Sequence, residues 1–343
     1  MANQKVDRPV LKQAEFPKDW GRRIGLCVLL SFFFFDLLTL IIPLPYHRLF
    51  RPTSTLVFDR TGKLMRAFTT DDGKWRIKTS LTHISPVLQK FLIAYEDRWF
   101  YWHPGVNPFA LLRAFRQNVK SGRVVSGGST LTMQIARMME PKPRTWRNKL
   151  IEIFRAVQLE RRFRKKQLLE IYFNIAPYGG NIEGVAAASW LYFAKEPEQL
   201  SIGEAALLSV LPNSPSELRP DLYPRRAREA RDKLLKRIYH YGLLKKKDYL
   251  EALNESIPAS RQDLPLIAPH LAQELKKRFP QEARIYSTVD LRTQILCEEL
   301  LKAHLKKLRN EGITNGAVVV IDNRKHELLA AVGSADFFNN LFH

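Results

Sequence analysis

The stretch Ile93-Ala94-Tyr95-Glu96-Asp97-Arg98-Trp99-Phe100-Tyr101-Trp102-His103-Pro104-Gly105 decides the fold, because it places acidic groups within a dense run of aromatic residues. Upstream, Ser85-Pro86 is a favourable helix start, and the residues that follow repeat apolar side chains at helical spacing. Glu96 then lies at the edge of an apolar face, where lost hydration would raise its pKa and make it a proton acceptor near neutral pH. The alternative is a surface ion pair of Glu96 with Arg98 or His103.

A second stretch, Ser126-Gly127-Gly128-Ser129-Thr130-Leu131-Thr132-Met133-Gln134, combines a glycine hinge, hydroxyl groups and a helix-like run. Such a loop can present backbone N–H groups and hydroxyls to an anion. At this spacing the two stretches together resemble the peptidoglycan glycosyltransferase domain of class A penicillin-binding proteins. The first family motif, Glu-Asp-x-x-Phe-x-x-His-x-Gly, is complete in Glu96, Asp97, Phe100, His103 and Gly105. The second, Gly-x-Ser-Thr-x-Thr-x-Gln, is matched by Gly127 or Gly128 and by Ser129, Thr130, Thr132 and Gln134.

Length and charge restrict the class of partner. With 343 residues, 45% of them hydrophobic, the chain can bury one large core and carry appendages. Lys and Arg number 55 against 34 Asp and Glu, a formal charge of +21, which favours nucleic acid, an acidic membrane surface or a phosphate-bearing substrate. The 2 cysteines are too few for a disulfide framework or a metal cluster.

The N-terminal part predicts a membrane anchor. Residues 1–23 read as a basic cytosolic tail, and the apolar run within 24–44 would span roughly 28 Å as a helix, close to a bilayer core. The insertion cost of Asp36 is outweighed by the surrounding apolar residues. No small-x-small cleavage site follows, which indicates an uncleaved signal anchor with its N-terminus inside. The rest of the chain is then expected on the periplasmic or extracellular side, which excludes nucleic acid as partner. A buried core helix is the alternative.

The remaining chain divides into four predicted parts. Residues 45–80 are predicted to form a β-hairpin linker, 81–253 an α-rich domain, and 254–315 a second linker that contains a helix from about Leu291 to Leu308. Two strands are predicted at 316–321 and 327–332, and this hairpin, within 316–343, resembles the start of a penicillin-binding transpeptidase domain. The fold class is therefore mainly α, with a short C-terminal α/β segment. The sequence contains no Ser-x-x-Lys and no Lys-Thr-Gly, so we expect a truncated bifunctional protein without transpeptidase activity. The amphipathic stretch 109–119 either faces the core or contacts the membrane.

Further motifs follow in family order. Lys149 and Glu152 are three residues apart and share a helix face, either directed into one cleft or forming an ordinary surface salt bridge. The resemblance implies that Lys149 engages a pyrophosphate and that Glu152 is the second catalytic carboxylate. The family commonly has Arg before that Lys; this chain has Asn148, so Arg147 or Arg144 would supply the charge. The fourth motif is carried by Glu170, Tyr172 and Asn174, interpreted as supporting residues, and the fifth by residues 200–215.

The resemblance implies a lysozyme-like domain that polymerises lipid II at the outer face of the cytoplasmic (inner) membrane. Glu96 would deprotonate the 4-hydroxyl of the lipid II GlcNAc, which attacks the anomeric carbon of the growing chain's MurNAc with inversion and expels undecaprenyl pyrophosphate. The implied substrate-binding residues are Asp97, His103, Gly128, Ser129, Thr130, Thr132, Gln134, Arg147, Lys149, Glu170, Tyr172 and Asn174. The implied partners are lipid II, the lipid-linked glycan chain and cell-wall synthesis proteins.

The need for a divalent cation and two alternative functions remain open at this point. Glu152 could orient the pyrophosphate directly or through Mg²⁺ or another divalent cation. A lytic muramidase would use Glu96 as a general acid and would shorten glycan rather than extend it. A non-catalytic membrane scaffold is the alternative from a different class. The basic residues around Lys149 argue against the muramidase, and the intact pair Glu96 and Glu152 argues against the scaffold.

Overall fold

The computed structural model describes residues 20–122 and 127–338, which divide into two compact units, one ending at Leu44 and the other beginning at Pro45. The first unit contains helix α1, Trp20–Ile41, over the predicted anchor. In the part of the chain that the structure describes, no helix is both long and apolar enough to cross a membrane. The anchor prediction is therefore not confirmed, and most of the predicted cytosolic tail lies outside the described residues.

The second unit begins with the predicted hairpin. Strands β1, Thr55–Phe58, and β2, Leu64–Phe68, pair antiparallel, and the Asp59 carboxylate accepts backbone N–H bonds from Thr61 and Lys63 to close the turn. The sheet has a third strand, because β6, Arg284–Tyr286, pairs parallel with β1. Its core contains Val57, Met65, Ala272, Ile285 and Val289, all buried. The linker and a segment more than two hundred residues later therefore share one sheet.

A second small sheet joins the linker to the helical domain. It has the order β3, Trp75–Arg76, then β5, Ile182–Glu183, then β4, Pro177–Gly179. The Arg76 Nε donates to Glu183 at 2.5 Å, and its two terminal nitrogens donate to the Asp72 carboxylate at 2.8 and 2.6 Å. Arg51 also reaches Glu183, at 3.3 Å. These ion pairs fix the segment after Pro45 against the domain that carries the site.

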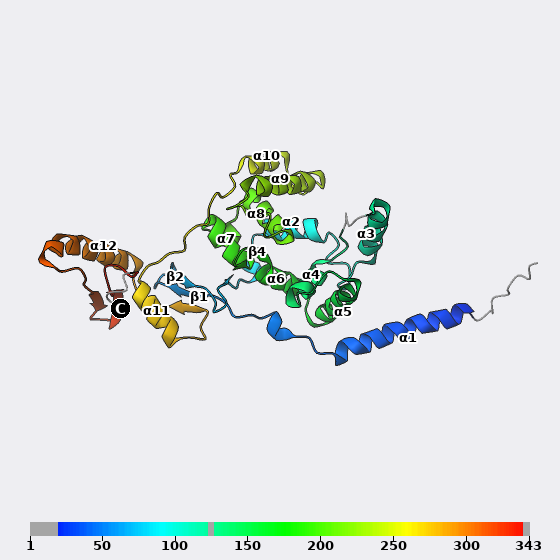
Figure 1. Ribbon diagram of the computed structural model, residues 1–343, viewed down its shortest axis with the longest axis horizontal. Coiled ribbons are helices and arrows are strands. Elements are labelled where there is room, and N and C mark those ends of the chain that lie inside the picture. The colour runs from blue at the N-terminus through cyan, green and yellow to red at the C-terminus, as the bar shows by residue number, and fades with distance from the viewer. Residues whose placement is uncertain (1–19, 123–126, 339–343) are drawn as a thin grey trace, which may run out of the picture. The chain divides into compact units, whose positions relative to one another are not determined.

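Helices form most of the second unit, as predicted, and those between residues 86 and 254 gather into one body in Figure 1. Helix α2 packs against α8, α8 against α9, and α4 against α5. The helices are α2 (Pro86–Glu96), α3 (Pro108–Ser121), α4 (Leu131–Met139), α5 (Trp146–Arg162), α6 (Lys165–Ile175), α7 (Val185–Phe193), α8 (Ile202–Val210), α9 (Pro224–His240) and α10 (Lys246–Asn254). Single-turn 3₁₀ helices occupy 46–48, 81–83, 197–199, 211–213 and 309–311.

Side-chain caps explain where the helices near the site begin. Thr130 accepts the N–H of Met133 at the start of α4, and Thr145 accepts the N–H of Asn148 at the start of α5. Each cap satisfies a backbone donor that the first turn leaves free. Helix α2 begins instead with Pro86, whose missing N–H is harmless at the first helical position. Glu96 is the last residue of α2.

The C-terminal part of the second unit is mixed. Helix α11 spans Pro269–Arg278 and α12 spans Leu291–Leu308, the latter beginning at an Asp290 cap. Strands β7, Val318–Asp322, and β8, Glu327–Val332, form an antiparallel hairpin whose second strand packs on α12. The helix and both strands lie where the sequence pattern placed them.

Candidate active site

Glu96 combines burial with an unused oxygen. Its Oε2 accepts a hydrogen bond from Gln134 Nε2 at 2.7 Å, whereas its buried Oε1 has no hydrogen-bond partner among the described residues. Burial raises the pKa of Glu96 to about 7, against the opposing effects of the Gln134 hydrogen bond and the charges of Arg137 and Arg237. A carboxylate in this state can accept a proton near neutral pH. Neither Arg98 nor His103 forms the surface ion pair considered above.

Asp97 and His103 form a buried pair beside Glu96. The His103 Nε2 lies 2.9 Å from Asp97 Oδ2, which also accepts the backbone N–H of Leu131 at 3.0 Å. Because Leu131 is the first residue of α4, this carboxylate joins the loop after Glu96 to the start of that helix. Both residues are therefore placed to shape the loop rather than to face solvent.

Within the second motif, Thr130 and Thr132 hold the loop in place, whereas Ser129 and Gln134 contact Lys149 and Glu96. The Thr130 hydroxyl donates to the Gly105 carbonyl at 2.5 Å, and the fully buried Thr132 donates to Glu160 Oε1 at 2.6 Å. Gly105 has φ +90°, and a Cβ there would lie 2.8 Å from Glu160 Cγ. A Cβ on Gly128 would lie 2.9 Å from the Leu111 Cα, so this loop approaches α3 closely.

Lys149 and Glu152 meet the beginning of α4. The ammonium of Lys149 donates to Ser129 Oγ at 2.6 Å and to Glu152 Oε2 at 2.9 Å. Lys149 and Glu152 are only partly buried, so their charges stay accessible to an anionic ligand. Asn148 instead donates its amide to the Pro143 carbonyl at 2.8 Å, and Arg147 is exposed.

The fourth-motif residues have separate roles. Tyr172 is fully buried, and its hydroxyl lies 3.4 Å from Gln134 Oε1, behind the amide that holds Glu96. Burial raises the pKa of Tyr172 well above its ordinary value, so it stays a neutral donor. Glu170 accepts the backbone N–H of Leu81. The Asn174 side chain accepts the backbone N–H of Thr79 and donates to the Thr79 carbonyl. Glu170 and Asn174 thus fasten the entry of the domain to α6.

Sequence reasoning missed two cations that act on Glu96. Arg137 lies three residues after Gln134 on α4, so helical spacing could have placed it on the same side. Arg237 comes from α9, far along the chain, and no motif indicated it. The charges of both arginines lower the pKa of Glu96 and partly offset its burial. The site is therefore more cationic than the motifs alone suggested.

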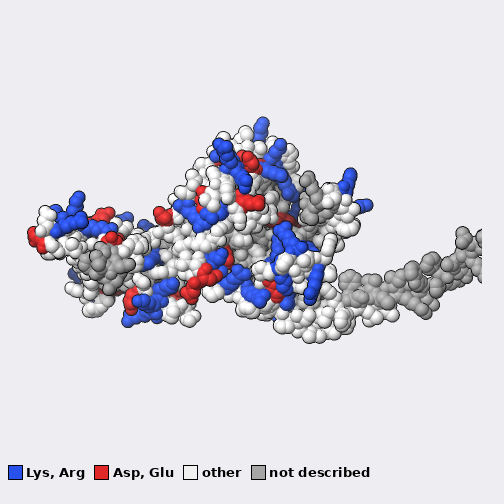
Figure 2. All heavy atoms as spheres, in the orientation of Figure 1, with Lys and Arg blue, Asp and Glu red and all other residues white. Residues whose placement is uncertain are grey.

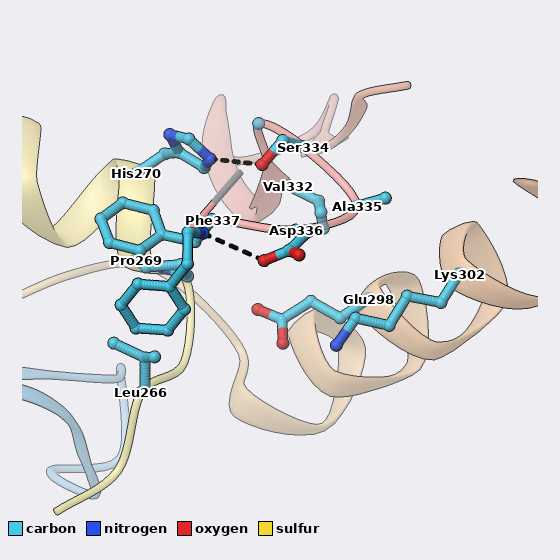
Figure 3. Close-up of a pocket in the computed structure, with 12 residues that line it drawn as sticks. Leu266, Pro269, His270, Glu298, Lys302, Val332, Ser334, Ala335, Asp336 and Phe337 are labelled. Carbon is cyan, nitrogen blue, oxygen red and sulfur yellow. Dashed lines mark hydrogen bonds between the residues drawn. The ribbon is translucent and has the colours of Figure 1, made fainter. Parts of the chain in front are cut away.

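Two further observations concern ligands. Over the described ranges, no cluster of three or more His, Cys, Asp or Glu side chains could hold a metal ion. A cavity of about 340 Å³ lies in the C-terminal part, where His270 of α11 faces Ser334 and where Glu298 and Lys302 of α12 line the wall (Figure 3). That cavity contains none of the predicted site residues.

Comparison with known proteins places this geometry in a family. The transglycosylase family profile matches residues 61–239. Penicillin-binding protein 1C of Escherichia coli (strain K12) is 41% identical over 86% of this chain and 38% of its own length. Penicillin-binding protein 1A of Aquifex aeolicus (strain VF5) is 31% identical over 83% of this chain and 41% of its own length.

The match to solved structures is more distant. Penicillin-binding protein 1A from Haemophilus influenzae aligns with a TM-score of 0.36 and 21% identity, over 80% of this chain and 33% of that chain, so it adds nothing to the assignment. This chain spans about two fifths of the length of the two curated relatives above. The family match covers more than half of the chain, and the five motifs lie in or directly beside the matched range. The chain therefore belongs to the transglycosylase family of the class A penicillin-binding proteins.

Proposed function

We propose that this chain is a peptidoglycan glycosyltransferase that polymerises lipid II into glycan strands. The observation that carries the proposal is Glu96, whose buried Oε1 is unpartnered and whose pKa is raised to about 7. A base with that pKa is partly ionised at neutral pH yet strong enough to remove a hydroxyl proton as the new bond forms. The Gln134 amide holds the other carboxylate oxygen and so fixes the direction in which Oε1 can accept a proton.

The reaction follows from these groups. Glu96 takes the proton of the acceptor GlcNAc 4-hydroxyl while that oxygen bonds to the anomeric carbon of the donor MurNAc. The bond from that carbon to the pyrophosphate oxygen breaks with inversion, and undecaprenyl pyrophosphate leaves with the bonding electron pair. Lys149, held by Ser129 and Glu152, supplies positive charge to the leaving group. Such preorganised charge acts where negative charge develops.

No step of the proposal needs a metal ion. A divalent cation, if bound, would be held by Glu152 and would add positive charge beside the pyrophosphate. Glu152 already receives the Lys149 ammonium. We therefore assign the orientation of the pyrophosphate to Lys149 and Glu152 together, and Mg²⁺ remains an optional addition in the proposal.

The location proposed is the outer face of the cytoplasmic membrane. Helix α3 supports it, because both of its phenylalanines are exposed rather than core-facing: Phe109 is 83% exposed and Phe115 57%. Trp146 at the start of α5 is 81% exposed. Amphipathic helices with exposed aromatic and basic residues bind at membrane interfaces, which suits a lipid-linked substrate.

Polymerisation of labelled lipid II by the purified chain in detergent tests the proposal, with products sized on a gel. Long glycan from the wild type and none from Glu96→Gln is expected. Glu204→Gln is the control for the loss of a carboxylate, because Glu204 pairs with Lys195 in the helix cap of α8 and not with the groups around Glu96. Shortened products from preformed glycan would indicate a muramidase. If a folded wild type catalysed no reaction, the non-catalytic membrane scaffold would be the remaining function.

A further inference from the structure

Two arginines from distant parts of the chain converge on one tyrosine near Glu96. The Arg98 guanidinium carbon lies 4.7 Å from the centroid of the Tyr241 ring, and that of Arg237 lies 5.4 Å from the same centroid. Arg237 Nε also donates to the Tyr241 hydroxyl at 2.9 Å. Arg98 follows Glu96 by two residues, whereas Arg237 lies in the last turn of α9 and Tyr241 is its C-cap. One aromatic ring thus holds two like charges together.

Among residues 20–122 and 127–338, no carboxylate forms an ion pair with Arg98 or Arg237, although the charge of Arg237 acts at longer range on Glu96. Two like charges on one ring repel each other, and a bound anion would reduce that repulsion. Both side chains are exposed, and Tyr241 is 37% exposed, so an anion could reach them from solvent. Figure 2 shows Lys and Arg also gathered over α9 and α10, a field that would attract such an anion.

The chemistry of the proposed reaction specifies the anion. Donor and acceptor are both lipid-linked pyrophosphates, so the enzyme needs two pyrophosphate sites. Lys149, from α5, is placed to serve the leaving group. The acceptor's pyrophosphate stays bonded to its own sugar, one disaccharide away from the hydroxyl that meets Glu96. Arg98 follows α2 and Arg237 lies on α9, whereas Lys149 lies on α5. Helix α9 packs directly on α2, the helix that ends in Glu96.

We propose that Arg98, Tyr241 and Arg237 form the subsite that binds the pyrophosphate of the acceptor lipid II. The assignment rests on the proposed glycosyltransferase function. The two guanidinium groups would donate charge-assisted hydrogen bonds to the phosphate oxygens, and Tyr241 would keep them at a fixed separation. Binding at this subsite would set which lipid-linked sugar presents its 4-hydroxyl to Glu96.

Direct binding is the first test. Inorganic pyrophosphate is titrated by calorimetry into the full chain, into Arg98→Gln and into Lys149→Met. We expect two classes of site in the wild type, with each variant losing a different one. Arg225→Gln is the charge-matched control, because it removes an exposed arginine at the other end of α9 and should retain both classes. An Arg98→Gln protein that binds pyrophosphate as the wild type does would overturn the proposal.

Kinetics supplies the second test. A lipid II whose GlcNAc 4-hydroxyl is capped can act only as donor, so the dependence of the rate on uncapped acceptor can be measured separately. Arg98→Gln should raise the acceptor concentration for half-maximal rate by about fivefold or more, since one charge-assisted bond is lost, and leave the donor dependence unchanged. Tyr241→Phe should have a smaller effect of the same kind. An increase confined to the donor would contradict the assignment.

A last comparison separates the two anionic groups of the acceptor. With an acceptor that lacks the stem peptide and its carboxylates, the effect of Arg98→Gln should persist. Disappearance of the effect would show that the peptide is the ligand and would overturn the proposal. Failure of the glycosyltransferase function itself would show as a wild type without Glu96-dependent polymer, whereas failure of this subsite leaves that polymer intact.

Discussion

Replacing Glu96 by Gln should make the protein more stable at alkaline pH while abolishing its activity. Burial raises the pKa of this carboxyl, so the folded state holds a proton more tightly than the unfolded chain does. The stabilisation from that proton is fully present below the ordinary pKa and is lost as the pH rises through about 7. Above that pH the wild type keeps a buried carboxylate, whereas Gln is neutral and can still accept the Gln134 hydrogen bond.

The size of the effect follows from the shift. Moving a pKa from 4.5 to about 7 corresponds to about 3 kcal/mol, which is an upper bound because Glu96 is partly accessible. At pH 5 the Glu96 carboxyl of the wild type is protonated in the folded state and only partly ionised in the unfolded state. The gain in the free energy of unfolding from Gln therefore falls to about 1 kcal/mol. The difference between the variants should therefore grow by about 2 kcal/mol between pH 5 and pH 8.5.

Thermal unfolding followed by circular dichroism in detergent measures this difference. Glu96→Gln should melt several degrees above the wild type at pH 8.5 and nearly with it at pH 5. Glu152→Gln is the control, because Glu152 receives the Lys149 ammonium and should gain no stability at high pH. Equal melting temperatures at pH 8.5, or a gap that does not change with pH, would refute the argument that Glu96 occupies a desolvating site.

Four further predictions follow from the same contacts. The polymerisation rate should rise about tenfold per pH unit below about 7 and level off above it, because only ionised Glu96 accepts the proton; a flat profile would contradict this. Lys149→Met should lower kcat by about 10²-fold with little change in melting temperature, measured on labelled lipid II. Asn174→Ala should lower the free energy of unfolding by about 2–3 kcal/mol in urea titrations, since three hydrogen bonds are lost, yet leave the pH midpoint of the rate in place. Gly105→Ala should destabilise by about 1–3 kcal/mol, because φ is +90° and the added Cβ meets the Ala156 carbonyl at 2.9 Å; melting at wild-type temperature would exclude that strain.

Local sequence signals predicted the elements that local physics determines. The Ser85-Pro86 start and the apolar spacing after it gave the helix that the structure forms as Pro86–Glu96. The helix from Leu291 and the two strands after it were likewise predicted from periodicity and turn residues. The raised pKa of Glu96 was also predicted, since its place at an apolar helix edge is a local property.

Long-range contacts were beyond the sequence. Asn174 was predicted to support the cleft, but its side chain bonds to the backbone of Thr79, 95 residues earlier. The hydroxyl of Thr132 could have faced a ligand, and only the packing of α4 on α5 shows that it is buried against Glu160. The charge of Arg237 acts on Glu96 because α9 packs on α2. Each of these depends on which helix faces meet, which spacing along one segment does not specify.

The parallel pairing of β1 with β6 has a mechanical consequence. Chain entering the helical domain passes through β1, and chain leaving it returns through β6 to the adjacent place in the same sheet. The helical domain is thus a loop of chain whose two ends are held side by side by the backbone hydrogen bonds between β1 and β6. Tension applied between Thr55 and the C-terminal segment would load that sheet first. The distances around Glu96 would stay unstrained until β1 and β6 separated.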